Sequence, residues 1–199
     1  MRWGMAIDLK SCVGCNSCTL ACKVENATPP EIQWIRVMEK EEGKYPTAKR
    51  SFFPLRCNHC ADPPCLTICP TGATYKRDDG IVLVDYKKCI GCGACMIGCP
   101  YQVRFKWENG RGYYSNGYTP FEEEGYARYE EGTCQKCTFC SHRLDQGLPP
   151  ACVQTCPTRA LTFGDLDDPD SEINQLLRAR HSTRPREELG TQPSTFYLT

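Results

Sequence analysis

The chain has 199 residues, and its 24 basic side chains balance its 24 acidic ones. This length allows one compact domain or two small ones, and zero net charge gives no electrostatic reason to expect binding to nucleic acid or to an anionic membrane surface. The unusual feature is cysteine, at seventeen residues, which is far above the usage of an ordinary globular chain.

In chain order, the first predicted elements are short strands and cysteine groups. An apolar run from Ala6 to Leu9 predicts a strand leading into the first group, and a similar run from Ile81 to Val84 leads into the third. Within every group the fourth cysteine follows the third after three residues, a step that can open a short helix. The first group (spacing x2, x2, x3) is Cys12, Cys15, Cys18 and Cys22; the second (x2, x4, x3) is Cys57, Cys60, Cys65 and Cys69; the third (x2, x2, x3) is Cys89, Cys92, Cys95 and Cys99; the fourth (x2, x11, x3) is Cys137, Cys140, Cys152 and Cys156.

Two segments lack this pattern. Residues 101–133 are rich in aromatic residues and glycine and contain no grouped cysteine, so we interpret them as a surface insertion whose tyrosines either pack locally or touch a partner. Further along, Asp167 to Ser171 can cap a short helix that runs to about Arg180. The last twenty residues are expected to be extended, and we interpret 166–199 as a C-terminal docking extension.

The chain also repeats itself, which indicates duplication. The segment from Ala6 to Cys15 resembles the one from Leu83 to Cys92, and Cys69-Pro-Thr-Gly-Ala resembles Cys156-Pro-Thr-Arg-Ala. We therefore expect an α+β fold, loop-rich, of two interleaved modules like bacterial ferredoxins, with short strands and helices organised around iron–sulfur clusters. The expected units are an outer module of 1–30 plus 134–165, an inner module of 50–100, the insertion of 101–133 and the C-terminal extension.

The spacing of the cysteines is typical of 4Fe–4S ligation. In a C-x2-C-x2-C loop three thiolates reach three irons of one cubane, while the fourth cysteine, often followed by proline, binds the other cluster of a two-cluster module. Crossing the groups in this way predicts four 4Fe–4S clusters. Cluster one takes Cys12, Cys15, Cys18 and Cys156; cluster two takes Cys22, Cys137, Cys140 and Cys152; cluster three takes Cys57, Cys60, Cys65 and Cys99; cluster four takes Cys69, Cys89, Cys92 and Cys95.

Two other uses of cysteine fit the sequence less well. A disulfide scaffold is disfavoured because the sequence starts without an apolar signal segment and because disulfide frameworks rarely repeat C-x2-C-x2-C. A zinc-stabilised scaffold could also consume sixteen thiolates, but tetrahedral zinc gives no reason for a third and a fourth cysteine at these positions. Since no apolar stretch is long enough to cross a bilayer, we expect no direct membrane span and no export except as the passenger of a folded partner.

A few residues remain outside the cluster assignment. Cys134 is left over and is interpreted as a free or partly buried thiol, while His59, between two predicted ligands, either bonds a sulfide or serves a structural role. Basic residues next to the groups are expected to tune potential or to contact a partner; they are Lys10, Arg56, Lys88 and Lys136. Neither a phosphate-binding loop nor a nucleophile elbow is present, so no catalytic residue is predicted.

The whole chain resembles the four-cluster iron–sulfur subunits of the dimethyl-sulfoxide-reductase superfamily of molybdopterin oxidoreductases. Its pattern is most like that of the small subunits of polysulfide, thiosulfate and arsenate reductases. The segments that carry the resemblance are Cys12-Val-Gly-Cys15, Cys57-Asn-His-Cys60, Pro63-Pro-Cys65, Cys69-Pro-Thr-Gly, Cys89-Ile-Gly-Cys92, Cys99-Pro-Tyr, Lys136-Cys-Thr-Phe-Cys140-Ser-His-Arg143, Cys152-Val-Gln-Thr-Cys156-Pro157, Gly164 to Pro169, and Phe196-Tyr-Leu198.

The resemblance implies electron transfer with a large catalytic subunit that carries a molybdenum or tungsten pterin centre, and possible contact with a membrane subunit that exchanges electrons with quinone. It places cluster one nearest the catalytic subunit. It leaves two compartments open, the periplasmic side as passenger of an exported partner, or the cytoplasm. The alternatives are a free polyferredoxin and a subunit of a hydrogenase or formate-oxidising complex. A free carrier is expected to be monomeric and strongly acidic, whereas this chain is neutral and has a docking-like tail.

Overall fold

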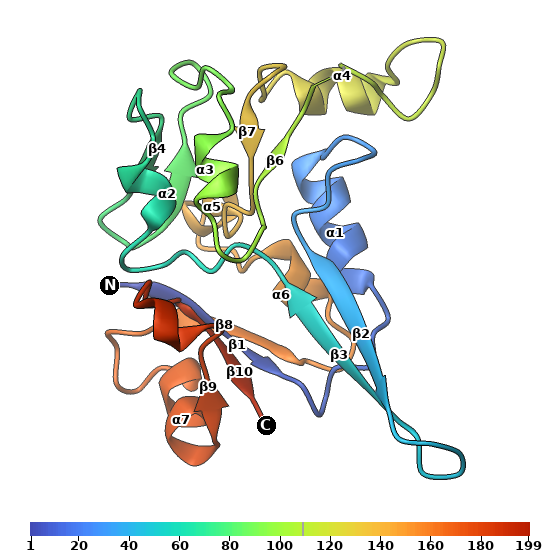
Figure 1. The fold of residues 1–199 in the computed structure, drawn as a ribbon, viewed down its shortest axis with the longest axis vertical. Helices are drawn as coiled ribbons and strands as arrows, with labels where there is room; N and C mark the ends of the chain where they lie inside the picture. The colour runs from blue at the N-terminus through green and yellow to red at the C-terminus, as the bar shows by residue number, and fades with distance from the viewer. Residues whose placement is uncertain (109) are drawn as a thin grey trace.

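A computed structural model describes residues 1–108 and 110–199; residue 109, inside the predicted insertion, lies outside the described residues. The chain forms a mixed α/β structure with many loops, whose largest sheet has four strands in the order β8-β1-β10-β9 (Figure 1). Strand β1 pairs in parallel with β10 and antiparallel with β8. The strand bounds are β1 Trp3–Asp8, β8 Leu161–Asp165, β9 Ser182–Thr183 and β10 Thr195–Leu198.

The expected strand from Ala6 to Leu9 overlaps β1 from Ala6 to Asp8, whereas Leu9 lies in the following turn. Because β1 pairs with β10, it brings the first and the last residues of the described chain side by side. The segment 166–199, interpreted as a docking extension, supplies two strands of this sheet, and every residue of β10 is buried. Because its side chains are Thr-Phe-Tyr-Leu, a pattern suited to a strand buried on both faces, β10 takes an inner position beside β1.

Helix α7, Glu172–Ala179, covers one face of this sheet (Figure 1). Its N-cap is Ser171, whose hydroxyl accepts a hydrogen bond from the backbone N–H of Asn174, so the capping prediction is confirmed. Ile173 is fully buried and packs with Ala6 of β1 and Leu198 of β10. A single apolar stripe thus fixes the helix on the sheet.

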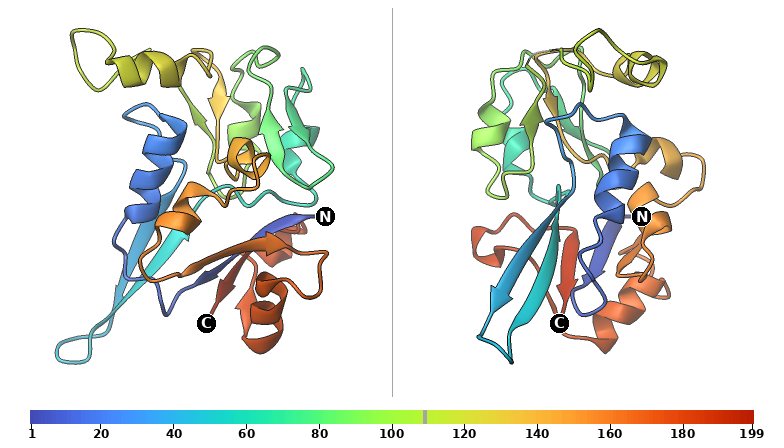
Figure 2. Two further views of the ribbon diagram at one scale, coloured as in Figure 1. Left: turned by 180° about the vertical axis from the view of Figure 1, so that it is seen from behind. Right: turned by 90° about the vertical axis from the view of Figure 1, so that its right-hand side faces the viewer.

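A long hairpin extends away from the rest of the molecule in the views of Figures 1 and 2. It consists of β2, Arg36–Glu42, and β3, Lys49–Leu55, paired from Arg36 with Leu55 to Glu42 with Lys49. Its outer half is exposed and charged, whereas Val37 and Pro54 at its base face the cysteines of the first group.

The remaining elements are short. The expected strand from Ile81 to Val84 is confirmed as β5, and each predicted step from third to fourth cysteine starts in a helix. The bounds are α1 Ser17–Asn26, α2 Pro64–Thr67, β4 Thr74–Lys76, β5 Val82–Val84, α3 Ala94–Ile97, β6 Phe105–Lys106, α4 Pro120–Tyr126, β7 Cys134–Gln135, α5 Ser141–Leu144, α6 Ala151–Thr155 and a 3-10 turn at Glu187–Leu189.

The main hydrophobic core is built around cysteines rather than around a continuous apolar layer. Six of its buried members are cysteines, which are Cys18, Cys22, Cys57, Cys99, Cys137 and Cys152. Trp107 and Tyr126, from the segment interpreted as an insertion, also belong to this core. Among the described residues, no helix has the length and apolar character needed to span a bilayer.

Candidate iron–sulfur cluster sites

In each cysteine group, the residue two positions after the first cysteine has a left-handed backbone conformation. These four residues are Gly14, His59, Gly91 and Phe139, with φ angles of 69°, 43°, 66° and 54°. The left-handed turn curls the loop so that successive cysteines point to one side, and glycine adopts it at the lowest cost. Two groups use glycine as expected, whereas His59 and Phe139 depart from the usual preference.

The curled loops bring distant cysteines together around three cavities of equal size, each with about 330 Å³ of empty space that includes open solvent. One is lined by Cys12, Cys15, Cys18 and Cys156, which are the four cysteines predicted for cluster one. Another is lined by the cluster-three cysteines Cys57, Cys60, Cys65 and Cys99, and the last by the cluster-four cysteines Cys69, Cys89, Cys92 and Cys95 together with Cys134.

The cysteines predicted for cluster two also lie together. Besides burial, the neighbouring Cys137, Cys152 and Cys140 raise the pKa of Cys22, and all four side chains are buried. The side-chain amide of Asn26 reaches the sulfur of Cys22 at 3.6 Å and that of Cys140 at 3.9 Å. Cys22 lies in α1 and Cys152 in α6, and these two helices pack against each other. The four cysteines therefore join two segments far apart in the sequence.

The donor set suits iron–sulfur clusters. Soft thiolates are the preferred ligands of such clusters, and backbone amides that point at sulfur help to stabilise them. Amide N–H groups of Thr74, Cys134 and Phe139 donate to cysteine sulfurs at 3.5 Å in each case. No three His, Cys, Asp or Glu side chains in residues 1–108 and 110–199 converge closely enough to hold one metal ion.

We call the cysteines predicted to bind clusters one to four sets one to four. The four sets follow one another in a line. Besides burial, Cys18 of set one raises the pKa of Cys152 of set two, and Cys57 of set three raises the pKa of Cys137 of set two, so these side chains are neighbours. Sets three and four are bridged by Arg104, which lines the set-three cavity and donates at 3.7 Å to Cys134 Sγ in the set-four cavity. The order is therefore one, two, three, four.

Exposure divides this line into two ends and a middle. All eight cysteines of sets two and three are buried, whereas Cys15 of set one and Cys92 of set four are exposed. In the same two end sets Cys12, Cys156, Cys69 and Cys89 are partly exposed. Redox centres at these ends would be accessible to partners, and those in the middle would be shielded.

Three basic side chains are buried among the cysteines: Arg56 is 2%, Arg104 4% and Lys136 1% exposed. No carboxylate in the described part of the chain lies within 4.0 Å of any of them. Arg56 Nη1 donates to Cys152 Sγ at 3.7 Å, and its Nε has no partner among the described residues. Since an unpaired buried cation is strongly destabilising, an anionic group such as a thiolate-ligated cluster would fit the charge of these sets.

Sequence reasoning identifies Arg56 and Lys136 but not Arg104, since nothing in the local sequence marks it. The other two basic residues named from the sequence, Lys10 and Lys88, are exposed. Arg104 Nη1 donates to Thr74 Oγ1 at 3.1 Å and to Cys134 Sγ at 3.7 Å, while its Nη2 has no partner in the part of the chain that the structure describes.

His59 and Phe139 stack on each other with ring centroids 3.8 Å apart. They occupy equivalent positions of the second and fourth cysteine groups, so the stack joins these two groups. His59 Nδ1 accepts the backbone N–H of Val82 at 3.0 Å, and burial holds its pKa well below the ordinary value. The geometry fits both predicted roles of His59, because the ring is packed while its buried Nε2 has no partner among the described residues.

Burial also acts on the cysteines. It raises the pKa of Cys152 and of Cys60 to about 12 each, and it raises that of Cys22 well above its ordinary value. At the exposed end the hydrogen bond with Ser17 lowers the pKa of Cys15. Because metals bind the thiolate, loading the buried sets must release protons.

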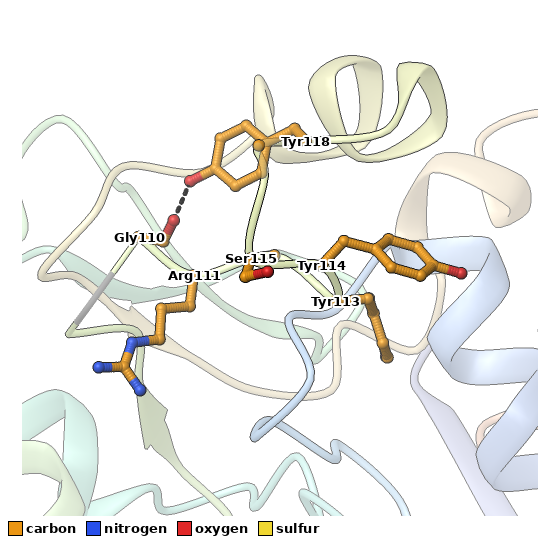
Figure 3. A pocket seen from close by; sticks show the side chains of 8 residues that line it. Gly110, Arg111, Tyr113, Tyr114, Ser115 and Tyr118 are labelled. Atoms are coloured by element: carbon orange, nitrogen blue, oxygen red, sulfur yellow. Dashed lines mark hydrogen bonds between the residues drawn. The ribbon is translucent and has the colours of Figure 1, made fainter.

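A larger, more open cavity lies away from all the cysteine sets. It encloses about 950 Å³ and is lined by residues 110–115, 117 and 118 (Figure 3). The Tyr118 hydroxyl donates to the Gly110 carbonyl across it. Its described lining residues include no cysteine, histidine or carboxylate, so its chemistry differs from that of the three cysteine-lined cavities.

Comparison with known proteins gives consistent matches along the chain. Two family models, both described as a 4Fe–4S dicluster domain, match residues 48–166 and 11–73. The chain is 45% identical to a selenate reductase subunit of Mesobacillus selenatarsenatis, with all of this chain and 72% of the relative aligned. It is 42% identical to the arsenate respiratory reductase iron–sulfur subunit ArrB of Shewanella sp., with 100% of this chain and 96% of the relative aligned.

A third relative is a polysulfide reductase polypeptide of Wolinella succinogenes, 39% identical, with 99% of this chain and 94% of the relative aligned. Two matched dicluster domains correspond to four 4Fe–4S clusters, the number predicted from the sixteen grouped cysteines. These matches favour iron–sulfur clusters over the zinc scaffold.

Proposed function

Because the chain belongs to the iron–sulfur subunits of the dimethyl-sulfoxide-reductase superfamily, we propose that it relays electrons between a large molybdenum- or tungsten-pterin catalytic subunit and a second redox partner. It is an electron-transfer subunit with four 4Fe–4S clusters. When bound, such clusters supply one-electron centres between which electrons tunnel.

The proposed ligands are the sixteen cysteines in their four crossed sets. Sets one, three and four each line a cavity, and the cysteines of set two lie buried together where α1 packs on α6. Both observations support this assignment. The crossing also supports the finer fold proposal of two interleaved modules like bacterial ferredoxins. Residues 1–30 with 134–165 would form the outer module, and residues 50–100 the inner one.

The observation that carries the relay proposal is the linear order of the sets with exposed ends. Electrons would enter at one exposed set and leave at the other, while the buried cysteines of sets two and three keep solvent and unrelated oxidants away. Arg56, Arg104 and Lys136 would hold the clusters electrostatically and set their potentials, since nearby cations favour the reduced, more negative state.

We propose that the catalytic subunit docks at set one. The relatives are named as parts of reductases, which supports a catalytic partner for this chain as well. Around set one, the exposed Cys15 lies close to the base of the β2–β3 hairpin. The exposed, charged outer half of the same hairpin offers a second contact area. The set-four end, with exposed Cys92, would serve the other partner, for which a membrane subunit that interacts with quinone is one candidate.

The test is purification of the tagged chain from its native host without oxygen, followed by metal analysis of what co-purifies. Molybdenum or tungsten with on the order of sixteen or more irons per chain supports the relay. Iron without either metal would instead favour a free polyferredoxin or a hydrogenase-type partner.

A variant tests whether the relay needs the set-one cluster. Cys15→Ser should remove the set-one cluster and stop electron transfer with the catalytic subunit, while the other three clusters keep their electron paramagnetic resonance (EPR) signals. Undiminished electron transfer in a variant shown to lack this cluster would contradict the relay.

A further inference from the structure

The set-four cavity contains five cysteines, although a 4Fe–4S cluster takes four. Besides Cys69, Cys89, Cys92 and Cys95, the side chain of Cys134 lines it. Cys134 lies in β7, far in sequence from the third cysteine group, and only 2% of its surface is exposed. From the sequence Cys134 is interpreted as a free or partly buried thiol, and the fold delivers this thiol to a proposed cluster site.

Cys134 contacts two of the proposed ligands directly. Its backbone N–H donates to Cys89 Sγ at 3.5 Å, and its side chain packs in the same buried cluster as that of Cys95. Because Cys95 and Cys134 line one cavity, a change of side-chain rotamer can move one iron from one sulfur to the other. The iron bound by Cys95 is thus the one within reach of Cys134.

Arg104 provides a second, independent indication. Its Nη1 donates to Cys134 Sγ at 3.7 Å, and its side chain lies between that sulfur and the neighbouring set-three cavity, which it lines. The side chain is buried with no carboxylate partner in the described residues, and its Nη2 is unsatisfied there. A fixed cation beside Cys134 stabilises its thiolate, which is the form in which a cysteine binds iron.

We propose that Cys134 is a reserve ligand of the set-four cluster, able to replace Cys95. In the exchange the bond from iron to Cys95 breaks and a bond from iron to Cys134 forms. The proton of the Cys134 thiol passes to Cys95, and the oxidation states of iron and sulfur do not change. The inference rests on the proposed assignment of set four.

The first test compares matched variants at the third cysteine of two groups. Cys65→Ala removes the equivalent ligand of set three, whose cavity has no fifth cysteine among its described lining residues. Each variant is purified anaerobically as the full chain, and iron per chain and the EPR spectrum of the reduced protein are measured. Cys95→Ala should keep the wild-type iron content and four cluster signals, whereas Cys65→Ala should lose one cubane.

The double variant Cys95→Ala/Cys134→Ala should lose the set-four cluster that the single variant keeps. Loss of that cluster in Cys95→Ala to the same extent as in Cys65→Ala would overturn the reserve-ligand proposal, and so would its retention in the double variant. Wild-type protein with fewer than four clusters would instead contradict the underlying assignment, so the two failures are distinguishable.

A second measurement does not depend on removing a primary ligand. Cys134→Ala should fold with all four clusters, but an iron chelator should extract the set-four cluster several-fold faster than from wild type, because a cluster opened at Cys95 is no longer recaptured. Equal extraction rates, or a missing cluster before chelation, would overturn the proposal.

Discussion

Replacing Arg56 by glutamine should lower the reduction potential of the set-two cluster. The guanidinium of Arg56 is 2% exposed and donates to Cys152 Sγ at 3.7 Å, with no carboxylate within 4.0 Å among the described residues. Glutamine keeps a polar side chain of similar reach but removes the positive charge. An added electron then loses a favourable electrostatic interaction, so the reduced state becomes less stable.

The size of the shift follows from Coulomb's law. A unit charge on Cys152 Sγ, 3.7 Å from Arg56, would interact by about 4.5 kcal/mol at an effective dielectric constant of about 20. The added electron is spread over the cluster beyond the sulfur, so roughly twice that distance is appropriate and the interaction is about 2 kcal/mol. For a one-electron couple this corresponds to a shift of about −90 mV.

The measurement is an EPR-monitored redox titration of the purified wild-type and variant proteins. Arg56→Lys should recover much of the potential, and Arg50→Gln, whose side chain is 60% exposed on strand β3, is the matched control expected to show no shift. A set-two potential in Arg56→Gln within about 20 mV of wild type would refute the reasoning, since it would mean that the buried cation does not interact with the cluster.

Three further outcomes follow from other parts of the structure. Arg180 hydrogen-bonds to Asp8 at 2.6 and 2.8 Å and holds the pKa of that carboxyl well below its usual range, so Asp8→Asn should reduce the free energy of unfolding by about 2 kcal/mol. Because the folded-state pKa is the lower one, this difference should be the same at pH 8 and pH 5 and shrink only below about pH 4; a difference that already shrinks between pH 8 and pH 5 in denaturant unfolding would be inconsistent with the ion pair. Gly91→Ala should lower the melting temperature and the retention of the set-four cluster, because the new Cβ would lie 2.1 Å from the carbonyl oxygen of Gly132, whereas Gly93→Ala, also at positive φ but with no atom within 4 Å, should cost only about 1 kcal/mol; equal melting temperatures for the two variants would count against the clash. Removing iron with a chelator under anaerobic conditions should unfold the chain, as followed by circular dichroism, because cysteines that need a cluster occupy much of its core; an iron-free chain that keeps its native spectrum would contradict this.

The local parts of the structure are predictable because local rules decide them. Cysteine spacing predicts which loops curl around a cubane, and Ser171 shows a helix start that a capping rule identifies. The fourth cysteine of each group stands four positions after the third, so the same local spacing offers it to a neighbouring set each time.

The parts that could not be predicted depend on contacts between distant segments. The pairing of β10 with β1 cannot be read from either strand, because an apolar run indicates a strand but not its neighbour. The stack of His59 on Phe139 and the burial of Arg104 likewise depend on contacts between segments far apart in the sequence. Since sequence reasoning measures local preference, it leaves two roles open for His59 and does not identify Arg104.

The nested arrangement of the chain has a consequence for the order of its biosynthesis. Sets three and four have all their cysteines once Cys99 has been made. Set one has all of its cysteines only once Cys156 has been made, and Met5 can pair with Thr195 only later still. Closing so large a loop is slow on topological grounds. During translation, iron–sulfur delivery can therefore proceed from the middle of the chain outward, and set one, the proposed docking end, is completed last.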